Sequence, residues 1–322
     1  MRKRAKVWNK QQLQMRTTFI EELLAQARLD PHLFLSVADL GYSVVDAFAA
    51  ELPKQYLNAG VAEQNLTGLA AGLAAEGYHV FTYSIANFPT FRCAEQIRND
   101  VAYHGLPVTV VVVGGGLAYG NLGYSHHAVQ DYALLRSFPG MTICAPGDPM
   151  EVRACLRYLI AHPGPSYLRL GKGQEPMVHA TIPEVSPWRF VPLHPDVPAR
   201  RSTFLTTGTT LALAASVAKS PELNAEWSVH SLPVWSACPD VESVASFIER
   251  FDRVVVLEDH LAAGGFGSAL REALESKPSL QSRLRCIALD PEICGLVGKQ
   301  QALNHRGGLT PERILAACSA CG

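Results

Sequence analysis

Gly60-Val61-Ala62-Glu63-Gln64-Asn65 opens a predicted helix that continues as Leu66-Thr67-Gly68-Leu69-Ala70-Ala71-Gly72-Leu73-Ala74-Ala75. A glutamate in the first turn of a helix is common, because the positive end of the helix dipole favours a carboxylate there. This helix is too rich in alanine, glycine and leucine to be a solvated surface element. A carboxylate that enters a buried helix is costly unless a partner compensates its charge. We therefore expect a specific partner for Glu63.

Apolar, β-branched segments alternate with helical patterns around this helix. The run 108–113 is apolar along nearly its whole length, which is typical of a strand buried on both faces of a sheet. The patterns predict strands at 33–37, 79–83, 108–113 and 166–170, and helices at 63–75, 95–103 and 150–161. Strands that alternate with helices in this way indicate parallel α/β layering.

A change in composition divides the chain. Prolines recur at 183, 187, 192, 195 and 198, and few periodic signals survive there. A second α/β pattern follows, with strands predicted at 203–207 and 254–258 and a helix at 267–274. The predicted fold class is α/β, with two domains that each contain a mostly parallel sheet flanked by helices. The first domain is predicted at 1–183, the linker at 184–199 and the second domain at 200–322.

Composition excludes several classes of protein. The chain has 322 residues, 48% of them hydrophobic, and a net charge of −1, so no global field favours nucleic acid or an anionic membrane. The basic start, Met1 to Lys6, lacks a following apolar run, and no segment is long enough to span a bilayer. The eight cysteines lie mostly in apolar runs, and Cys318 and Cys321 have no second pair nearby. We expect a reduced, cytoplasmic protein with no metal site of its own.

The motif at Glu63 carries a family resemblance. Gly-Val-Ala-Glu-Gln followed by an Ala/Gly-rich helix is similar to the pyrimidine-binding domain of transketolases and 1-deoxyxylulose-5-phosphate synthases. The resemblance implies the thiamine-diphosphate pyrimidine-binding fold, followed by a transketolase C-terminal domain. In that family the glutamate hydrogen-bonds the aminopyrimidine ring of the cofactor, whose exocyclic nitrogen then takes the proton from the thiazolium carbon. By this match Glu63 is the activating, catalytic carboxylate.

Aromatic residues follow in the segment that surrounds the aminopyrimidine in this family. The match assigns Phe88 and Phe91 to the cofactor pocket, with Tyr83 as a further candidate, within 83–92. Aromatic side chains that only fill the core are the alternative. The turn 39–43, Asp-Leu-Gly-Tyr-Ser, resembles the substrate-side turn and makes Ser43 a substrate candidate.

Histidines and arginines complete the candidate site. Gly123-Tyr124-Ser125-His126-His127 is similar to the family loop Gly-Pro-Thr-His-Gln, so His126 matches the catalytic histidine that faces the substrate, with His127 beside it. Arg169 matches an arginine that grips the substrate phosphate, and Arg16 matches another on the first helix. A planar guanidinium suits phosphate because it makes bidentate, charge-assisted bonds. A structural histidine and surface salt bridges are the alternatives.

The resemblance covers the second domain but omits a third. Leu257-Glu258-Asp259-His260, the run 264–269 and the run 308–312 resemble the transketolase C-terminal domain, which is chiefly an assembly module. Enzymes of this class bind pyrophosphate through a metal held by a Gly-Asp-Gly motif, and this chain contains none. The resemblance therefore implies a partner subunit that holds thiamine diphosphate with Mg²⁺ or Ca²⁺, in a heterotetramer of two plus two.

The expected function is that of one subunit of a two-component transketolase. It would transfer a two-carbon ketol unit from a ketose or ketose phosphate to an aldehyde. Gly114-Gly115-Gly116 and Asn121-Leu122 stand where pentose-phosphate transketolases usually carry a histidine and an aspartate, which puts the usual sugar specificity in doubt. Three alternatives remain open. The chain could be a beta-type subunit of a 2-oxoacid-decarboxylating enzyme or a non-catalytic interaction protein. The third is a nicotinamide-binding protein, because the glycines after strand 108–113 loosely resemble a dinucleotide-binding motif.

Overall fold

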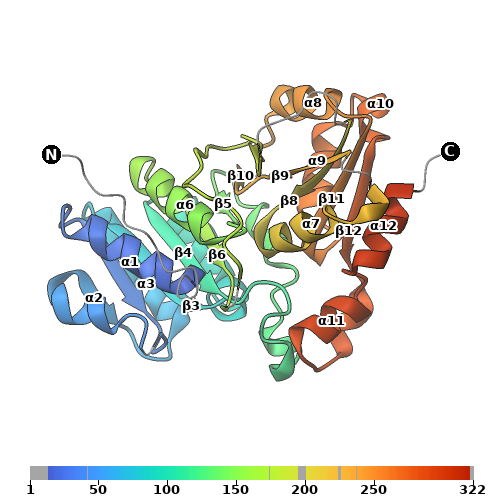
Figure 1. Ribbon diagram of the computed structural model, residues 1–322. Coiled ribbons are helices and arrows are strands. Elements are labelled where there is room, and N and C mark those ends of the chain that lie inside the picture. The colour runs from blue at the N-terminus through green and yellow to red at the C-terminus, as the bar shows by residue number, and fades with distance from the viewer. Residues whose placement is uncertain are drawn as a thin grey trace, which may run out of the picture.

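A computed structural model describes residues 14–41, 43–173, 175–194, 201–223, 226–236 and 238–319. The basic N-terminal stretch, the end of the predicted linker (195–199) and Cys321 lie outside these residues. The chain forms two α/β units that lie side by side, the N-terminal one in blue and green and the C-terminal one in yellow to red (Figure 1). Within the described part of the chain, every helix is too short or too polar to cross a lipid bilayer.

The first unit is built on a sheet in the order β10-β5-β6-β4-β3-β1-β2. All its neighbours are parallel except β10, which runs antiparallel to β5. Its strands are β1 (Leu33–Val37), β2 (Tyr56–Asn58), β3 (His79–Ile85), β4 (Val108–Val113), β5 (Thr142–Cys144), β6 (Ser166–Leu170) and β10 (Val234–Ser236). Strands β1, β4 and β6 are buried along their whole length, and their bounds agree with those predicted from the sequence.

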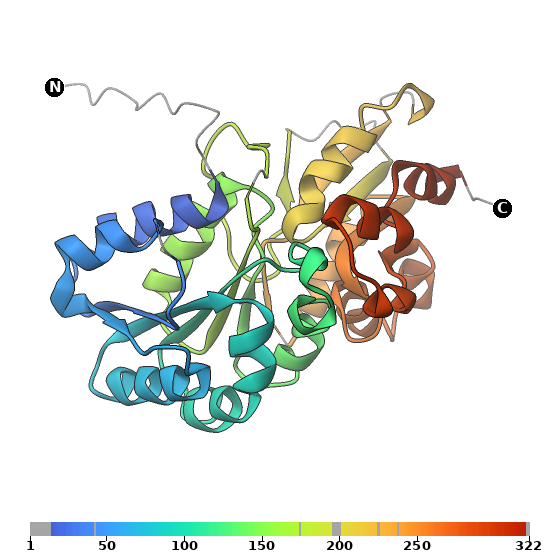
Figure 2. The ribbon, with the colours of Figure 1, turned by 90° about the horizontal axis from the view of Figure 1, so that it is seen from below.

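Helices cover both faces of this sheet (Figure 2). Leu33 and Leu35 of β1 pack with Phe19 and the other apolar residues of α1 and α6. The intervening Phe34 points to the opposite face and packs with Ala70 of α3. The helices of this unit are α1 (Met15–Ala27), α2 (Asp46–Glu51), η1 (Pro53–Gln55), α3 (Glu63–Ala75), η2 (Phe88–Arg92), α4 (Ala94–Gln96), η3 (Ile97–Ala102), η4 (Gly120–Leu122), η5 (Tyr124–His126), α5 (Asp131–Leu135) and α6 (Pro149–Ala161).

The helix predicted at 95–103 differs from an ordinary α-helix. Segments η2 and η3 are π-helical, so their backbone is wider than that of an α-helix. Bonds of the i→i+5 type, from Tyr103 N to Arg98 O and from Leu106 N to Val101 O, mark the end of the widened stretch. The widened backbone begins at Phe88, directly after β3.

The second unit is built on a sheet in the order β12-β11-β8-β9-β7, parallel except for β7. Its strands are β7 (Val191–Pro192), β8 (Ser202–Thr206), β9 (Trp227–Ser231), β11 (Arg253–Leu261) and β12 (Leu284–Leu289). Its helices are η6 (Gly208–Thr210), α7 (Leu211–Val217), η7 (Pro221–Leu223), α8 (Val241–Glu249), α9 (Phe266–Ala273), α10 (Pro278–Gln281), η8 (Pro291–Gly295), α11 (Gln300–Arg306) and α12 (Pro311–Ser319). The predicted mostly parallel, two-sheet α/β architecture is confirmed.

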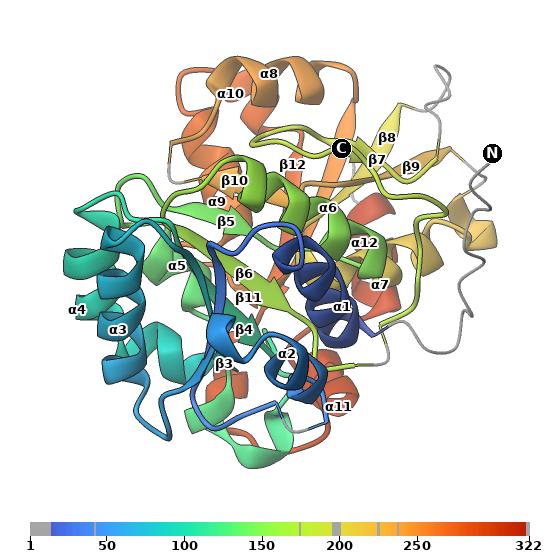
Figure 3. The same ribbon diagram turned by 90° about the vertical axis from the view of Figure 1, so that its left-hand side faces the viewer.

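Strand β10 belongs to the second half of the chain but completes the first sheet. It follows β9 and pairs with β5, with Trp235 opposite Ile143 (Figure 3). Trp235 is fully buried, and one apolar core runs from Val110 of the first unit to Leu284 of the second. We keep the predicted division into 1–183 and 200–322 as a proposal about folding units, with β10 as a strand that crosses it.

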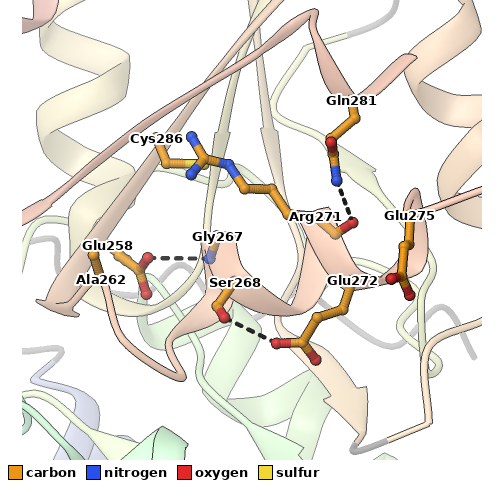
Figure 4. A pocket seen from close by; sticks show the side chains of 9 residues that line it. All are labelled: Glu258, Ala262, Gly267, Ser268, Arg271, Glu272, Glu275, Gln281 and Cys286. Carbon is orange, nitrogen blue, oxygen red and sulfur yellow. Dashed lines mark hydrogen bonds between the residues drawn. The ribbon is translucent and has the colours of Figure 1, made fainter. Parts of the chain in front are cut away.

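A buried carboxylate of β11 binds the N-terminus of α9 in the second unit. Glu258 of β11 accepts hydrogen bonds from the N–H groups of Phe266 (2.6 Å) and Gly267 (3.0 Å), at the wall of a pocket of about 340 Å³ (Figure 4). Burial raises the pKa of Glu258 from 4.5 to about 8, although these two N–H groups oppose the shift. Glu272 lines the same pocket, and a hydrogen bond from Arg136 lowers the pKa of the Glu272 carboxyl group.

We expect Glu258→Gln to gain stability relative to the wild type as pH rises. The pKa of Glu258 is raised by folding, so its contribution is complete below the unfolded value of 4.5 and is lost as pH rises to about 8. The difference in unfolding free energy should change by up to about 1.4 kcal/mol per pH unit between about pH 5 and 8. Denaturant titrations across this range measure it. Glu272→Gln is the matched control and should give a constant difference there, because its lowered pKa acts only at lower pH.

Candidate active site

Glu63 is the first residue of α3, which follows the carboxyl end of β2, an edge strand of the first sheet. Its side chain is 3% exposed, and its Oε2 lies 3.4 Å from Nη1 of Arg92. The loop before α3 is held in place by Asn58, whose Oδ1 accepts hydrogen bonds from the backbone N–H groups of Asp39 and Gly60, both at 3.0 Å. The helix N-terminus favours the buried carboxylate electrostatically, and Arg92 is a charged partner for it that the sequence did not indicate.

Phe88 and Arg92 stand four residues apart on η2. The guanidinium carbon of Arg92 lies 5.3 Å from the centroid of the Phe88 ring, within the usual range of a cation–π contact. The Arg92 side chain is 55% exposed, so solvent screens its attraction to Glu63. One guanidinium therefore contacts both the carboxylate and the aromatic face.

His126 lies on the other side of Phe88. The two rings meet edge to face at 5.0 Å, and Nδ1 of His126 lies 2.9 Å from Oγ of Ser125. Asn87 donates a hydrogen bond of 2.7 Å from Nδ2 to the carbonyl oxygen of Ser125, which ties η2 to the histidine loop. With Nδ1 occupied by Ser125, the free position on the imidazole is Nε2.

Two cations act on Tyr119, the aromatic neighbour of His126. The ring of Tyr119 lies 6.3 Å from that of His126, and the ammonium of Lys172 lies 4.3 Å from the Tyr119 centroid. Burial raises the pKa of the Tyr119 hydroxyl, and the charge of Arg16 opposes that shift. Arg16 and Lys172 are each half-buried. They could hold an anionic group at this end of the site.

Arg169 has other partners than the predicted substrate phosphate. Its side chain is 2% exposed, and its nitrogens bind Oδ2 of Asp131 (2.7 Å) and Oδ1 of Asp259 (2.6 Å). It also donates a hydrogen bond to the carbonyl oxygen of Ala128 at 2.9 Å. Asp259 belongs to the second unit, so Arg169 fixes the two units to each other, and we do not carry it into the proposed substrate site.

The glycines after β4 leave room for the buried ion cluster of Arg169, Asp131 and Asp259. A Cβ on Gly115 would lie 2.4 Å from the Arg169 guanidinium, and one on Gly116, whose φ is +63°, would lie 2.5 Å from the Asp259 carboxylate. Side chains there would collide with the ion pair. Close packing, and not a dinucleotide, therefore accounts for the glycine run.

Two predicted residues lie away from Glu63. Tyr83 is buried in the core and stacks on Phe19 at 6.1 Å, with Gly41 above its ring edge. This position corresponds to the core-filling alternative for Tyr83. Ser43 is exposed, has a φ of +65°, and donates a backbone hydrogen bond to the Asp46 carboxylate at the start of α2.

Phe91 and His127 line a neighbouring cavity. Together with Asn87, Tyr124, Ser125 and Gln130 they surround a space of about 360 Å³. Burial lowers the pKa of His127, a backbone hydrogen bond involving Gly120 opposes the shift, and the neighbouring His126 lowers the pKa further, so His127 is neutral near pH 7. The structure thus groups Phe88 with His126 at Glu63, and Phe91 with His127 beside them.

Sequence reasoning missed Arg92, Tyr119 and Lys172. The i, i+4 spacing of Phe88 and Arg92 was a usable signal, because residues at that spacing share one helix face. Lys172 follows the end of β6, and ligand sites in parallel α/β sheets lie at the carboxyl ends of strands. No sequence pattern indicated Tyr119.

The arrangement fits one end of thiamine diphosphate. A buried carboxylate and an aromatic ring both contact the same planar cation, and an aminopyrimidine ring offers groups that suit both contacts. In the part of the chain that the structure describes, no three His, Cys, Asp or Glu side chains group together in a way that could hold a metal.

Known proteins are similar to this chain in sequence. The family model described as "Transketolase, pyrimidine binding domain" matches residues 11–176, and "Transketolase, C-terminal domain" matches residues 194–314. A subunit of the apulose-4-phosphate transketolase of Phocaeicola vulgatus is 34% identical over 82% of this chain and 84% of its own. The 6-deoxy-6-sulfo-D-fructose transketolase subunit SqwH of Clostridium sp. (strain MSTE9) is 32% identical over 94% and 92%, respectively.

A solved structure extends the similarity to three dimensions. "Split gene transketolase, inactive beta4 tetramer" superposes with a TM-score of 0.79 and 29% identity, covering 94% of this chain and 96% of that one. The two family models together cover most of the chain, and both describe transketolase domains. The relatives above 30% identity, matched over most of their length, are transketolase subunits. This chain belongs to the transketolase family.

Proposed function

We propose that this chain is one subunit of a two-component, thiamine-diphosphate-dependent transketolase. It takes part in transferring a two-carbon ketol unit from a ketose or ketose phosphate to an aldehyde. The observation that carries the proposal is the cluster of Glu63, Phe88 and His126 at the start of α3. Relatives named as subunits of apulose-4-phosphate and sulfofructose transketolases support it.

Glu63 and Phe88 bind the cofactor. Thiamine diphosphate supplies the acidic carbon that accepts the two-carbon unit. Glu63 binds a ring nitrogen of the aminopyrimidine through its carboxylate and holds a proton there. Phe88 orients the ring by contact with its face, and the burial of Glu63 excludes water from this hydrogen bond.

His126 and the nearby cations act on the sugar. Nε2 of His126 accepts the proton of the donor hydroxyl as the carbon–carbon bond breaks, while Ser125 orients the ring through Nδ1. Lys172 and Arg16 bind the phosphate of the substrate, in place of Arg169. His127, Phe91 and Ser43 line the approach to this site.

A partner subunit supplies the missing half. It carries the Gly-Asp-Gly motif and the Mg²⁺ or Ca²⁺ that bind the pyrophosphate, and two copies of each chain form a heterotetramer in the cytoplasm. Val61, Leu122 and Tyr124 are exposed apolar side chains near the site and are suited to that contact. An obligate interface of this kind buries about 2,000 Å² or more.

We expect this chain alone to show no turnover with thiamine diphosphate and Mg²⁺, and to gain activity when the partner is added. The physical reason is that the pyrophosphate site lies on the other polypeptide. Release of glyceraldehyde 3-phosphate from xylulose 5-phosphate, in the presence of an aldehyde acceptor, measures the reaction. Turnover by the single chain contradicts the two-component proposal, and consumption of pyruvate in place of ketose donors contradicts the transketolase reaction.

A further inference from the structure

Arg92 occupies the gap between Glu63 and Phe88. Its Nη1 lies 3.4 Å from the Glu63 carboxylate, and its guanidinium carbon lies 5.3 Å from the centre of the Phe88 ring. These are the same two groups that the proposed function assigns to the aminopyrimidine ring. We expect Arg92 and that ring to compete for these contacts.

The guanidinium and the aminopyrimidine share their recognition chemistry. Both are flat and delocalised, both present N–H groups that a carboxylate accepts, and both can lie against an aromatic face. A lysine in this place would offer a compact charge without the flat surface. An arginine four residues after Phe88 on η2 therefore presents to Glu63 and Phe88 a group that resembles the cofactor ring.

We propose that Arg92 is an internal placeholder for the aminopyrimidine ring, and that the cofactor displaces it from Glu63 and Phe88. The inference rests on the proposed function, because it requires the cofactor to bind at Glu63. In the free subunit, Arg92 compensates the charge of the buried carboxylate and keeps the half-site ordered.

The contacts of Arg92 are weak enough to be exchanged. Its side chain is 55% exposed, and it meets Glu63 through one long contact of 3.4 Å. The buried pair of Arg153 and Glu22, at 2.5 Å with both side chains 5% exposed, represents the permanent kind of ion pair in this chain. Arg92 can swing into solvent without leaving a cation buried.

The first test measures thiamine diphosphate affinity in the reconstituted complex by titration of intrinsic fluorescence. The ion pair is exposed on the side of Arg92 only, and it and the cation–π contact are each worth about 1 kcal/mol, so their removal should tighten binding roughly five- to thirty-fold in Arg92→Ala. Arg98→Ala removes an exposed arginine from η3 as the matched control and should bind as the wild type does. Unchanged or weaker binding by Arg92→Ala overturns the placeholder.

The second test uses the free subunit and needs no activity. Arg92→Ala should melt at a lower temperature than the wild type, and added 4-amino-2-methylpyrimidine should raise its midpoint more than that of the wild type. The double variant Glu63→Gln/Arg92→Ala should not respond. An equal response of the wild type and Arg92→Ala overturns the placeholder. If the wild-type complex binds no thiamine diphosphate, the proposed function is contradicted together with the placeholder. If the wild-type complex binds the cofactor and Arg92→Ala does not bind it more tightly, only the placeholder is contradicted.

Discussion

Glu63→Ala is expected to lose proton exchange at the thiazolium carbon in the reconstituted complex. The carboxylate is proposed to hold the proton that drives the exocyclic nitrogen of the cofactor to act as a base, and Arg92 contacts both this carboxylate and the ring of Phe88. A loss of several kcal/mol of transition-state stabilisation corresponds to a decrease of about 10²–10⁴-fold, since each 1.4 kcal/mol is tenfold in rate. Hydrogen–deuterium exchange at this carbon, quenched in acid and read by NMR, measures the step directly.

Gln64→Ala is the matched control for this experiment. Gln64 is the next residue of α3 and is exposed, so its variant keeps the helix and should exchange at the wild-type rate. Glu63→Gln tests whether charge or shape matters, because it keeps the volume and removes the carboxylate. Exchange at the wild-type rate in Glu63→Ala would remove the activating role from this residue.

His126→Ala is expected to lose ketol transfer by roughly 10²–10⁴-fold, the usual span for a positioned acid–base group. Cofactor binding and assembly should persist, because Glu63 and Phe88 stay in place and His126 is only half-buried. Initial rates at saturating donor, together with the affinity for thiamine diphosphate, separate the two effects.

Two further variants sharpen the histidine test. His104→Ala removes an exposed histidine outside the site and should keep full activity. Ser125→Ala removes the hydrogen bond to Nδ1 of His126 and should give an intermediate loss, since the imidazole then loses its orientation. Full activity in His126→Ala would mean that the histidine pair is structural.

Most regular elements of this fold could be predicted from the sequence. Strands β1, β4 and β6 are mostly apolar and buried along their whole length, and α3 has a clear start and an apolar face, so local pattern and tertiary packing agree. The π-helical turns could not be predicted, because over six residues an α-helix and a π-helix bury nearly the same positions.

The role of Arg169 shows where residue chemistry alone is ambiguous. A guanidinium binds carboxylate and phosphate with the same geometry, so the arginine itself does not reveal its partner. Its partners Asp131 and Asp259 lie 38 and 90 residues away, and only the packing of the two units brings them together. Glu63 and His126 lie in local motifs, and for them the sequence was informative.

Strand β10 has a consequence for synthesis of the chain on the ribosome. The strands β1 to β6 leave the ribosome first, and Val234–Ser236 emerges only after much of the second half has been made. Until then the edge of β5 that β10 will cover stands open, including the backbone N–H of Ala145 that donates to the carbonyl oxygen of Pro233, and an open sheet edge invites pairing with other chains. A nascent or truncated polypeptide ending in the 184–199 region would keep that edge permanently. The first sheet therefore reaches its final form only late in translation, and fragments that lack β10 should aggregate where the whole chain does not.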